Sequence, residues 1–466
     1  MDGWLAGFVL WCGLCPWIQF VLEVHGGMGK WGGWGTFVLF GLYKGLYLAV
    51  FCALAGLLLK RWWSIPAIAA LWTGLERLHT YSGFSWLHLG NAAINMSWPM
   101  RLAPVLGVFG ISFAFALVSA ALAAVFFRRP TRELFWLVLL PLVFVFPSEP
   151  VLTAPRENAL VVQPNIDTEA QWTEAFLAST EQKLAALSHQ NRPGLIIWPE
   201  VPAPFYDSNA AFHAYAAKIA QASKTHFLFG AVAFNPDNQP LNSAVMMDPN
   251  GREIDRYDKI NLVPFGEFIP PPFGFVNRIT HEAGDFAAGR RIVVFPVDGH
   301  SVGAFICYES VFPDLVRQFT LHGAEVLVNL SNDGYFGNSQ AHQQHLEIAR
   351  MRAAENRRWI LRATNDGITA SIDPHGHIAN RIAPFQQSAA LMPFDYEREM
   401  TFYTRHGDWF AWSCLAGSLL LAGFSFFKKK PGTVHSNPDF LGCIATITLG
   451  RLLIILSTLL PTVVLA

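Results

Sequence analysis

Long apolar runs at both ends of the chain constrain its fold more than any other feature. A helix needs about 20 apolar residues to cross a lipid bilayer. Seven runs approach or reach this length, and they cover residues 4–24, 37–59, 65–78, 102–127, 134–146, 410–427 and 440–465. Glu76 and Arg77 interrupt the third run, and the fifth is short. Only 14% of all residues are charged, against about 25% in an average soluble domain. We therefore expect a membrane protein.

The apolar runs leave a polar region in the middle of the chain. Residues 156–400 contain no such run, and we expect them to form one soluble domain inserted between membrane helices. Transmembrane helices are expected in residues 1–150, another in 405–430, and an additional apolar segment in 438–466. The predicted fold class is a membrane α-helical bundle plus an inserted α/β domain.

Basic residues indicate which side of the membrane the soluble domain occupies, because they are enriched in cytoplasmic loops. If every run crosses once, three basic clusters fall on one side: Lys60 and Arg61; Arg128, Arg129 and Arg132; and Lys428, Lys429 and Lys430. The soluble domain then lies on the opposite, extracytoplasmic side. The formal net charge of −1 gives no indication of a nucleic-acid partner.

The polar region alternates between strand and helix patterns. Strands are expected at residues 159–163, 195–198, 227–229, 243–247, 253–257, 291–297, 302–306, 326–328, 368–372, 378–382 and 389–392. Asn250 and Gly251 are a strong signal for a hairpin turn. Helices are expected around 212–222 and 342–357, and also between the first two strands and after residue 310. This order predicts an α/β sandwich in which helices cover the sheets.

Cys307 is the only cysteine of the polar region, so a disulfide within the soluble domain is excluded. It follows the expected strand 302–306 and precedes a helical pattern. A cysteine on a sharp turn between strand and helix presents its sulfur as a nucleophile must. The alternative is an inert cysteine in the core.

Other polar residues at the ends of expected strands could complete such a site. Glu200 could serve as the general base, and Lys259 could stabilise the oxyanion together with the backbone N–H of Tyr308. Glu267 could orient Lys259 or an incoming amine. Taken singly, each could be an ordinary solvated side chain. We also expect Lys259 to favour the Cys307 thiolate, and hence fast alkylation of that thiol.

Two other polar groups have competing interpretations. His342 and His345 are spaced for one helix face, but no further Cys or His joins them, so we expect surface or packing roles rather than a metal site. Glu76 and Arg77 either form an interfacial pair with each other or contact substrate.

Several longer motifs carry a family resemblance. They are the residues at 198–200, 262–267, 307–309, 329–334, 349–355 and 362–365, with 83–87 and 403–409 in the membrane part. With these motifs the chain resembles the nitrilase, or carbon–nitrogen hydrolase, superfamily and, more narrowly, the bacterial apolipoprotein N-acyltransferase family. The resemblance implies an αββα sandwich for the soluble domain. Asn261 and Tyr335 depart from the family, which usually has histidine and tryptophan there.

The resemblance also implies a two-step reaction that needs no metal or cofactor. A fatty acyl chain moves from a phospholipid of the phosphatidylethanolamine type to a cysteine thiol. From there it moves to the α-amino group of a diacylglyceryl-cysteine on an apolipoprotein. By resemblance, the catalytic residues are Glu200, Lys259 and Cys307, and the supporting or substrate-binding residues are Glu267, Tyr308 and Glu309.

The resemblance places the protein in the bacterial cytoplasmic (inner) membrane as a multi-pass protein, with its catalytic domain on the periplasmic side. The apolar, proline-rich loop 268–276 is expected to face the membrane, although it could be a simple buried loop. Two alternatives stay open. One is a membrane-tethered amidase acting on a small amide with the same residues. The other is a non-enzymatic lipoprotein-binding or scaffold protein with a degenerate site.

Overall fold

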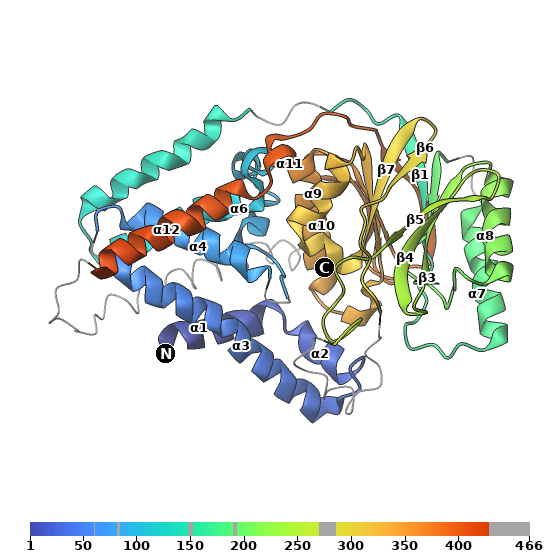
Figure 1. Cartoon of the computed structure of the whole chain (residues 1–466), viewed down its shortest axis with the longest axis horizontal. Helices are drawn as coiled ribbons and strands as arrows, with labels where there is room; N and C mark the ends of the chain where they lie inside the picture. Colours follow the sequence, from blue (N-terminus) through green and yellow to red (C-terminus); the bar gives the residue numbers. More distant parts are fainter. Residues whose placement is uncertain (60, 82–83, 148–151, 190–192, 270–285, 428–466) are drawn as a thin grey trace. The chain divides into compact units, whose positions relative to one another are not determined.

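The computed structural model describes residues 1–59, 61–81, 84–147, 152–189, 193–269 and 286–427 (Figure 1). The chain divides into two compact units. One consists of Met1–Gln19, Trp31–Pro150 and His406–Ala466, and the other of Phe20–Lys30 and Val151–Arg405. The sequence did not predict that residues 20–30 would group with the second unit. The apolar segment 438–466, the basic cluster at 428–430 and most of the loop 268–276 lie outside the described residues.

Apolar helices make up the first unit and the segments that join it to the second. Their bounds are α1 (Asp2–Leu14), α2 (Trp17–Glu23), α3 (Gly29–Leu58), α4 (Ser64–His79), η1 (Leu89–Ala93), α5 (Ser97–Met100), α6 (Ala103–Phe126), η2 (Thr131–Val145), α11 (Phe402–His406) and α12 (Trp409–Phe427). Among the described residues, α3, α6 and α12 are long and apolar enough to cross a membrane. The pair α1 and α2 reaches the same length, with a bend of 73° between the two helices.

Two expected spans are shorter in the structure than a full crossing. Residues 65–78 belong to α4, which has 16 residues, and 134–146 belong to η2, a 3₁₀ segment of 15 residues. A span normally needs about 20 residues, and both segments are shorter than this.

Small residues allow the helices of this unit to pack closely. A Cβ atom at Gly7 would lie 2.7 Å from the Cα of Gly45, and one at Gly74 would lie 2.5 Å from the Cα of Leu415. Glycine therefore lets α1 approach α3, and α4 approach α12, as is common between membrane helices.

The polar residues of α4 have partners other than the expected one. The guanidinium of Arg77 lies 2.6 Å from the carboxylate of Asp408, and both side chains are buried. Glu76 accepts a hydrogen bond of 2.7 Å from the backbone N–H of Leu89. The expectation of a Glu76–Arg77 pair is therefore wrong, because each charge is satisfied by a different segment.

The second unit contains two sheets of six strands each. The strands of the first sheet, in spatial order, are β12 (Ser388–Phe394), β1 (Glu157–Gln163), β2 (Leu195–Ile197), β3 (His226–Phe234), β4 (Pro240–Met247) and β5 (Glu253–Asp258). Those of the second are β11 (Ile378–Ile382), β10 (Thr369–Ile372), β9 (Ile360–Thr364), β8 (Val326–Ser331), β7 (His300–Ile306) and β6 (Val294–Val297). All eleven expected strand segments overlap strands, and β4 and β5 form the expected hairpin.

Helices cover the outer faces of both sheets (Figure 1). The helices α7 (Glu174–Ser188) and α8 (Ala210–Ser223) pack on the first sheet, and α9 (Pro313–Leu321) and α10 (Ala341–Asn356) on the second. Alternation along β1 builds two cores, because Ala159 and Val161 face the other sheet while Leu160 and Val162 face the helices. The predicted αββα sandwich is confirmed.

The strand β9 is the one that the sequence did not predict. Arg362 interrupts its apolar pattern, yet this side chain is fully buried. Its guanidinium donates to the side chains of Asn329 and Asp333. A buried cation is tolerated only with such partners. These partners lie about 30 residues before Arg362 in the sequence, so the local pattern around Arg362 does not predict the strand.

Candidate active site

Cys307 occupies the sharp turn that the sequence predicts. It follows the last residue of β7 and begins the short 3₁₀ segment η4 (Cys307–Val311), and its thiol is free. Its φ of +49° lies in the left-handed region, which is unfavourable for residues with a Cβ atom. A backbone held in this conformation needs support from its surroundings.

Glu309 provides part of this support. Its buried carboxylate accepts hydrogen bonds from the backbone N–H of Ile306 at 2.8 Å, of Ile260 at 2.7 Å and of Asn261 at 3.1 Å, and from the hydroxyl of Tyr257 at 2.7 Å. Burial raises the pKa of Glu309, and these hydrogen bonds oppose the rise. The side chain thus joins the cysteine turn to the segment that follows Lys259, which suits a positioning role.

Lys259 lies between two carboxylates. Its ammonium is 3.2 Å from Oε1 of Glu200 and 2.9 Å from Oε1 of Glu267, and the side chain is 1% exposed. Burial disfavours the charged form, but Glu200 and Glu267 outweigh it and raise the pKa of Lys259 well above its usual value. Lys259 is therefore a permanent cation, which a developing oxyanion requires.

Asn242 is a member of this cluster that the sequence analysis missed. Its amide nitrogen donates to Oε1 of Glu200 at 2.7 Å and to Oε1 of Glu267 at 2.8 Å. The second oxygen of Glu200 accepts from the backbone N–H of Asn332 at 2.9 Å. An asparagine inside β4 carries no sequence signal for this role, because only the pairing of β4 with β5 brings it beside Lys259.

The environment of Cys307 keeps its thiol protonated. Burial and the negative charge of Glu200 raise the pKa of the thiol far above its usual value, while Lys259 acts in the opposite direction. The expected influence of Lys259 in favour of the thiolate is therefore present, but burial and Glu200, which sequence reasoning did not count, outweigh it. The geometry calls for a base that acts as the thiol reacts, and Glu200 is placed beside it.

Tyr308 lies directly after the cysteine, and its side chain is buried. Its ring meets the edge of Phe312 with the centroids 5.3 Å apart. This packing fixes the peptide whose N–H was expected to help bind the oxyanion.

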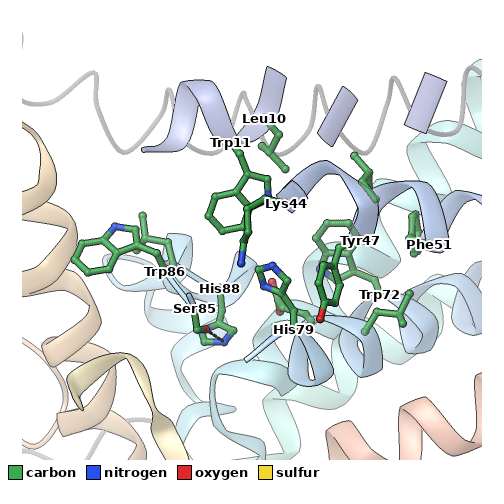
Figure 2. Close-up of a pocket in the computed structure, with 14 residues that line it drawn as sticks. Leu10, Trp11, Lys44, Tyr47, Phe51, Trp72, His79, Ser85, Trp86 and His88 are labelled. Carbon is green, nitrogen blue, oxygen red and sulfur yellow. Dashed lines mark hydrogen bonds between the residues drawn. The ribbon is translucent and has the colours of Figure 1, made fainter. Parts of the chain in front are cut away.

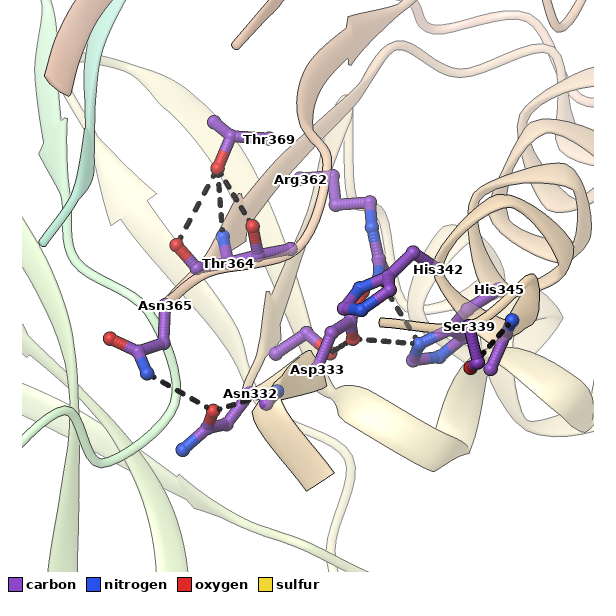
Figure 3. A network of polar contacts seen from close by, with 12 residues as sticks. Asn332, Asp333, Ser339, His342, His345, Arg362, Thr364, Asn365 and Thr369 are labelled. Atoms are coloured by element: carbon purple, nitrogen blue, oxygen red, sulfur yellow. Dashed lines mark hydrogen bonds and ion pairs between the residues drawn. The ribbon is translucent and has the colours of Figure 1, made fainter. Parts of the chain in front are cut away.

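A second polar network lies behind the cysteine turn (Figure 3). His345 places Nε2 3.1 Å from the carbonyl oxygen of Cys307 and Nδ1 3.0 Å from Oδ1 of Asp333. The other oxygen of Asp333 accepts from Arg362 at 2.6 Å. Burial opposes ionisation of Asp333, but Arg362 and His345 hold its pKa well below the usual value. A chain of contacts thus links β9 and α10 to Cys307.

From the sequence, His342 and His345 are expected either to lie on the helix surface or to pack inside the domain, and the structure shows that they pack inside it. Both are buried, and His342 accompanies His345 in the Asp333 network. The alternative position on the helix surface is wrong.

An aromatic group that the sequence analysis did not assign to the site lies beside it. The ring of Tyr335 meets the edge of His25 with centroids 5.0 Å apart, and Phe20 contacts Gly337. The negative charges of Glu200 and Glu267 contribute to raising the pKa of Tyr335, although its side chain is 48% exposed. The segment Phe20–Lys30 thus contributes to the surroundings of the site.

Comparison with known proteins identifies the family. Residues 159–396 match the carbon–nitrogen hydrolase family, and residues 1–121 match the apolipoprotein N-acyltransferase N-terminal domain. The apolipoprotein N-acyltransferase of Geobacter metallireducens is 33% identical, over 92% of this chain and 87% of its own. The chain belongs to the apolipoprotein N-acyltransferase family. The same enzyme of Nitrosomonas europaea is 34% identical, over 81% of this chain and 79% of its own.

Among solved structures, an amidase from Nesterenkonia sp. matches this family member with 18% identity and a TM-score of 0.39. The match covers 56% of this chain and 96% of the amidase. Family membership and the apolar helices make the chain a membrane-bound acyltransferase of the carbon–nitrogen hydrolase superfamily.

Proposed function

We propose that this protein transfers a fatty acyl chain from a phospholipid to the α-amino group of a diacylglyceryl-cysteine at the N-terminus of apolipoproteins. The observation that carries this proposal is the assembly of Glu200, Lys259 and Cys307 from the ends of three strands into one charged cluster. The relatives named above support the choice of substrates.

In the first half-reaction, Glu200 removes the thiol proton as the sulfur attacks the carbonyl carbon of the donor ester. The negative charge moves to the carbonyl oxygen, where Lys259 and the backbone N–H of Tyr308 stabilise it. The carbon–oxygen bond then breaks, and Glu200 returns its proton to the departing alkoxide. The products are a Cys307 thioester and a lysophospholipid, and the donor is a lipid of the phosphatidylethanolamine type.

In the second half-reaction, the free amine of the lipoprotein attacks the thioester carbonyl. Glu200 takes a proton from the attacking nitrogen, and Lys259 again stabilises the oxyanion. The carbon–sulfur bond breaks, and the sulfur regains a proton from Glu200. The product is an amide, and the cysteine is restored for the next cycle.

The supporting residues divide into two roles in this proposal. Glu267 holds Lys259 and is itself held by Asn242 and by the backbone N–H of Val263 at 2.8 Å. Glu309 and Tyr308 hold the turn that carries the thiol. We further propose that the enzyme resides in the bacterial inner membrane with the catalytic unit on the periplasmic face. The contact of Arg129 with the backbone carbonyl of Leu59 supports this, because it brings the basic segment 128–132 to the same end of the first unit as Arg61.

The test is product formation by the purified full chain in detergent. Incubation with a labelled phosphatidylethanolamine and a diacylglyceryl-cysteine peptide should yield labelled N-acyl peptide and lysophospholipid in equal amounts. Cys307→Ala and Glu200→Gln should abolish both products. An unchanged yield with Cys307→Ala would remove Cys307 as the nucleophile. Absence of both products in the parent would favour a binding protein, and hydrolysis of small amides without acyl transfer to the peptide would favour an amidase.

A further inference from the structure

A cavity with a mainly apolar lining and a few polar side chains lies inside the first, apolar unit of the chain (Figure 2). The helices α1, α3 and α4 and the segment before η1 line this partly enclosed cavity of about 60 Å³. A single water needs about 10–15 Å³ by this measure, so the cavity has room for a small polar group. Its lining combines aromatic rings with four ionisable side chains, those of Lys44, Glu76, His79 and His88.

Lys44 is the lysine that lines the cavity. It lies in the middle of α3, the side chain is fully buried, and its ammonium donates to the backbone carbonyl of Phe84. The ammonium also lies 4.7 Å from the centre of the Trp11 ring. A cation in an apolar helix is costly, and such residues characteristically face a cavity or a functional partner. Lys44 follows this rule, and Figure 2 shows its amine directed toward His79 and His88.

Other groups of the lining supply hydrogen-bond donors beside Lys44. Glu76 is engaged by the backbone N–H of Leu89 at 2.7 Å. The ring of His79 packs edge-on against Tyr47 with centroids 4.1 Å apart, and Nε2 of His88 lies 3.5 Å from the hydroxyl of Ser85. Imidazole and hydroxyl groups can donate to an oxyanion, and a lysine ammonium binds phosphate as a point charge.

The two helices α1 and α3 that line the cavity also carry exposed apolar side chains. Leu5 and Val9 of α1 and Leu39 and Val50 of α3 are 49–66% exposed. An occupant with one anionic group and long hydrocarbon chains could place its charge at Lys44 and its chains along these residues. An anion without hydrocarbon chains would use only the contact with Lys44.

We propose that this cavity binds the phosphate group of a membrane phospholipid, with Lys44 as its cationic anchor. This proposal adds a lipid-binding site to the proposed function. It rests on that function only for the statement that the bound lipid is also the acyl donor. It names a contact for the phosphate that lies in the apolar unit and not among the residues around Cys307.

The experiment measures equilibrium binding of a short-chain phosphatidylethanolamine to the detergent-solubilised full chain carrying Cys307→Ala, so that no acyl transfer consumes the ligand. Adding Lys44→Met should weaken binding at least tenfold, because the methionine keeps the length and removes the charge. The matched control is Lys30→Met, which removes an exposed lysine of the same helix and should leave affinity unchanged. Short-chain diacylglycerol, which lacks phosphate, should bind the parent at least tenfold more weakly.

Three results would overturn the proposal: unchanged affinity in Lys44→Met, equal binding of diacylglycerol, or inorganic phosphate binding as tightly as the lipid. The last would indicate a site for a free anion. Thermal unfolding checks that Lys44→Met is folded. If Lys44→Met does not fold, Lys44→Arg supplies the test. This variant keeps the positive charge, so it should bind the lipid within about threefold of the parent. Loss of lipid binding in Lys44→Arg would contradict the role of Lys44. Lys44-dependent binding without any thioester in the parent would remove the proposed function and leave the lipid site intact.

Discussion

Replacement of Lys259 by methionine separates its role in catalysis from its role in stability. The ammonium lies 3.2 Å and 2.9 Å from two carboxylates that also share the amide of Asn242. At an effective dielectric constant of 20, each contact contributes about 5 kcal/mol of attraction before the cost of burial. Removing one partner of a buried ionic group costs about 3–5 kcal/mol of stability. We expect Lys259→Met to lose about this much.

The double variant Lys259→Met/Glu267→Gln isolates the catalytic part. Lys259, Glu200 and Glu267 carry a charge of −1 together, the single variant carries −2, and the double variant returns to −1. The double variant should therefore regain most of the stability. Acyl transfer to Cys307 should stay reduced by about 10²–10³-fold, because the cation that stabilises the oxyanion is still missing.

The assay follows lysophospholipid release in a single turnover, and thermal unfolding follows stability. The matched control is Lys218→Met, which removes an exposed lysine of α8 and should change neither quantity. The reasoning is refuted if Lys259→Met forms the thioester at the parental rate, or if the double variant regains both stability and rate.

Three further predictions concern the surroundings of the nucleophile. Because burial and Glu200 raise the pKa of the Cys307 thiol, iodoacetamide should alkylate it more slowly than free cysteine at pH 7, with a rate that still rises at pH 9; faster alkylation at pH 7 contradicts this. His345→Phe should lower kcat at least tenfold with KM within about twofold, because His345 supports the Cys307 carbonyl and does not bind substrate; steady-state kinetics decide, and a change in KM alone argues against positioning. Because Arg362 and His345 depress the pKa of Asp333 against its burial, Asp333 stabilises the fold above its ordinary pKa of about 3.9, and this contribution is lost as the pH falls toward the lowered value. Asp333→Asn should therefore destabilise most at pH 7 in thermal unfolding and less below pH 4, whereas the exposed control Asp314→Asn should change little at either pH.

The sequence predicts the sandwich and the cysteine turn because both depend on local patterns. Short continuous apolar runs define strands such as β1, and Glu200, Lys259 and Cys307 each follow one of the predicted strands. Sheet topology then brings strand ends together, so their proximity could be anticipated. The strand β9 was not predicted, because the partners of its buried Arg362 are Asn329 in β8 and Asp333 just after that strand.

Other parts of the site depend on contacts that no local pattern encodes. Asn242 is one polar residue inside a strand, and Asn332 acts through its backbone N–H. The sequence predicts the influence of Lys259 on the Cys307 thiol but not the opposing influence of burial, which depends on the packing around the thiol. The pairing of Arg77 with Asp408 joins residues more than 300 positions apart, beyond the reach of sequence spacing.

The most direct test of the central claim is the intact mass of the protein after exposure to phosphatidylethanolamine alone. The account predicts a mass increase of one fatty acyl group, located on Cys307, which disappears when a diacylglyceryl-cysteine peptide is added and is absent in Cys307→Ala. An unmodified mass under conditions where the parent still acylates the peptide would contradict the thioester and with it the role assigned to Cys307.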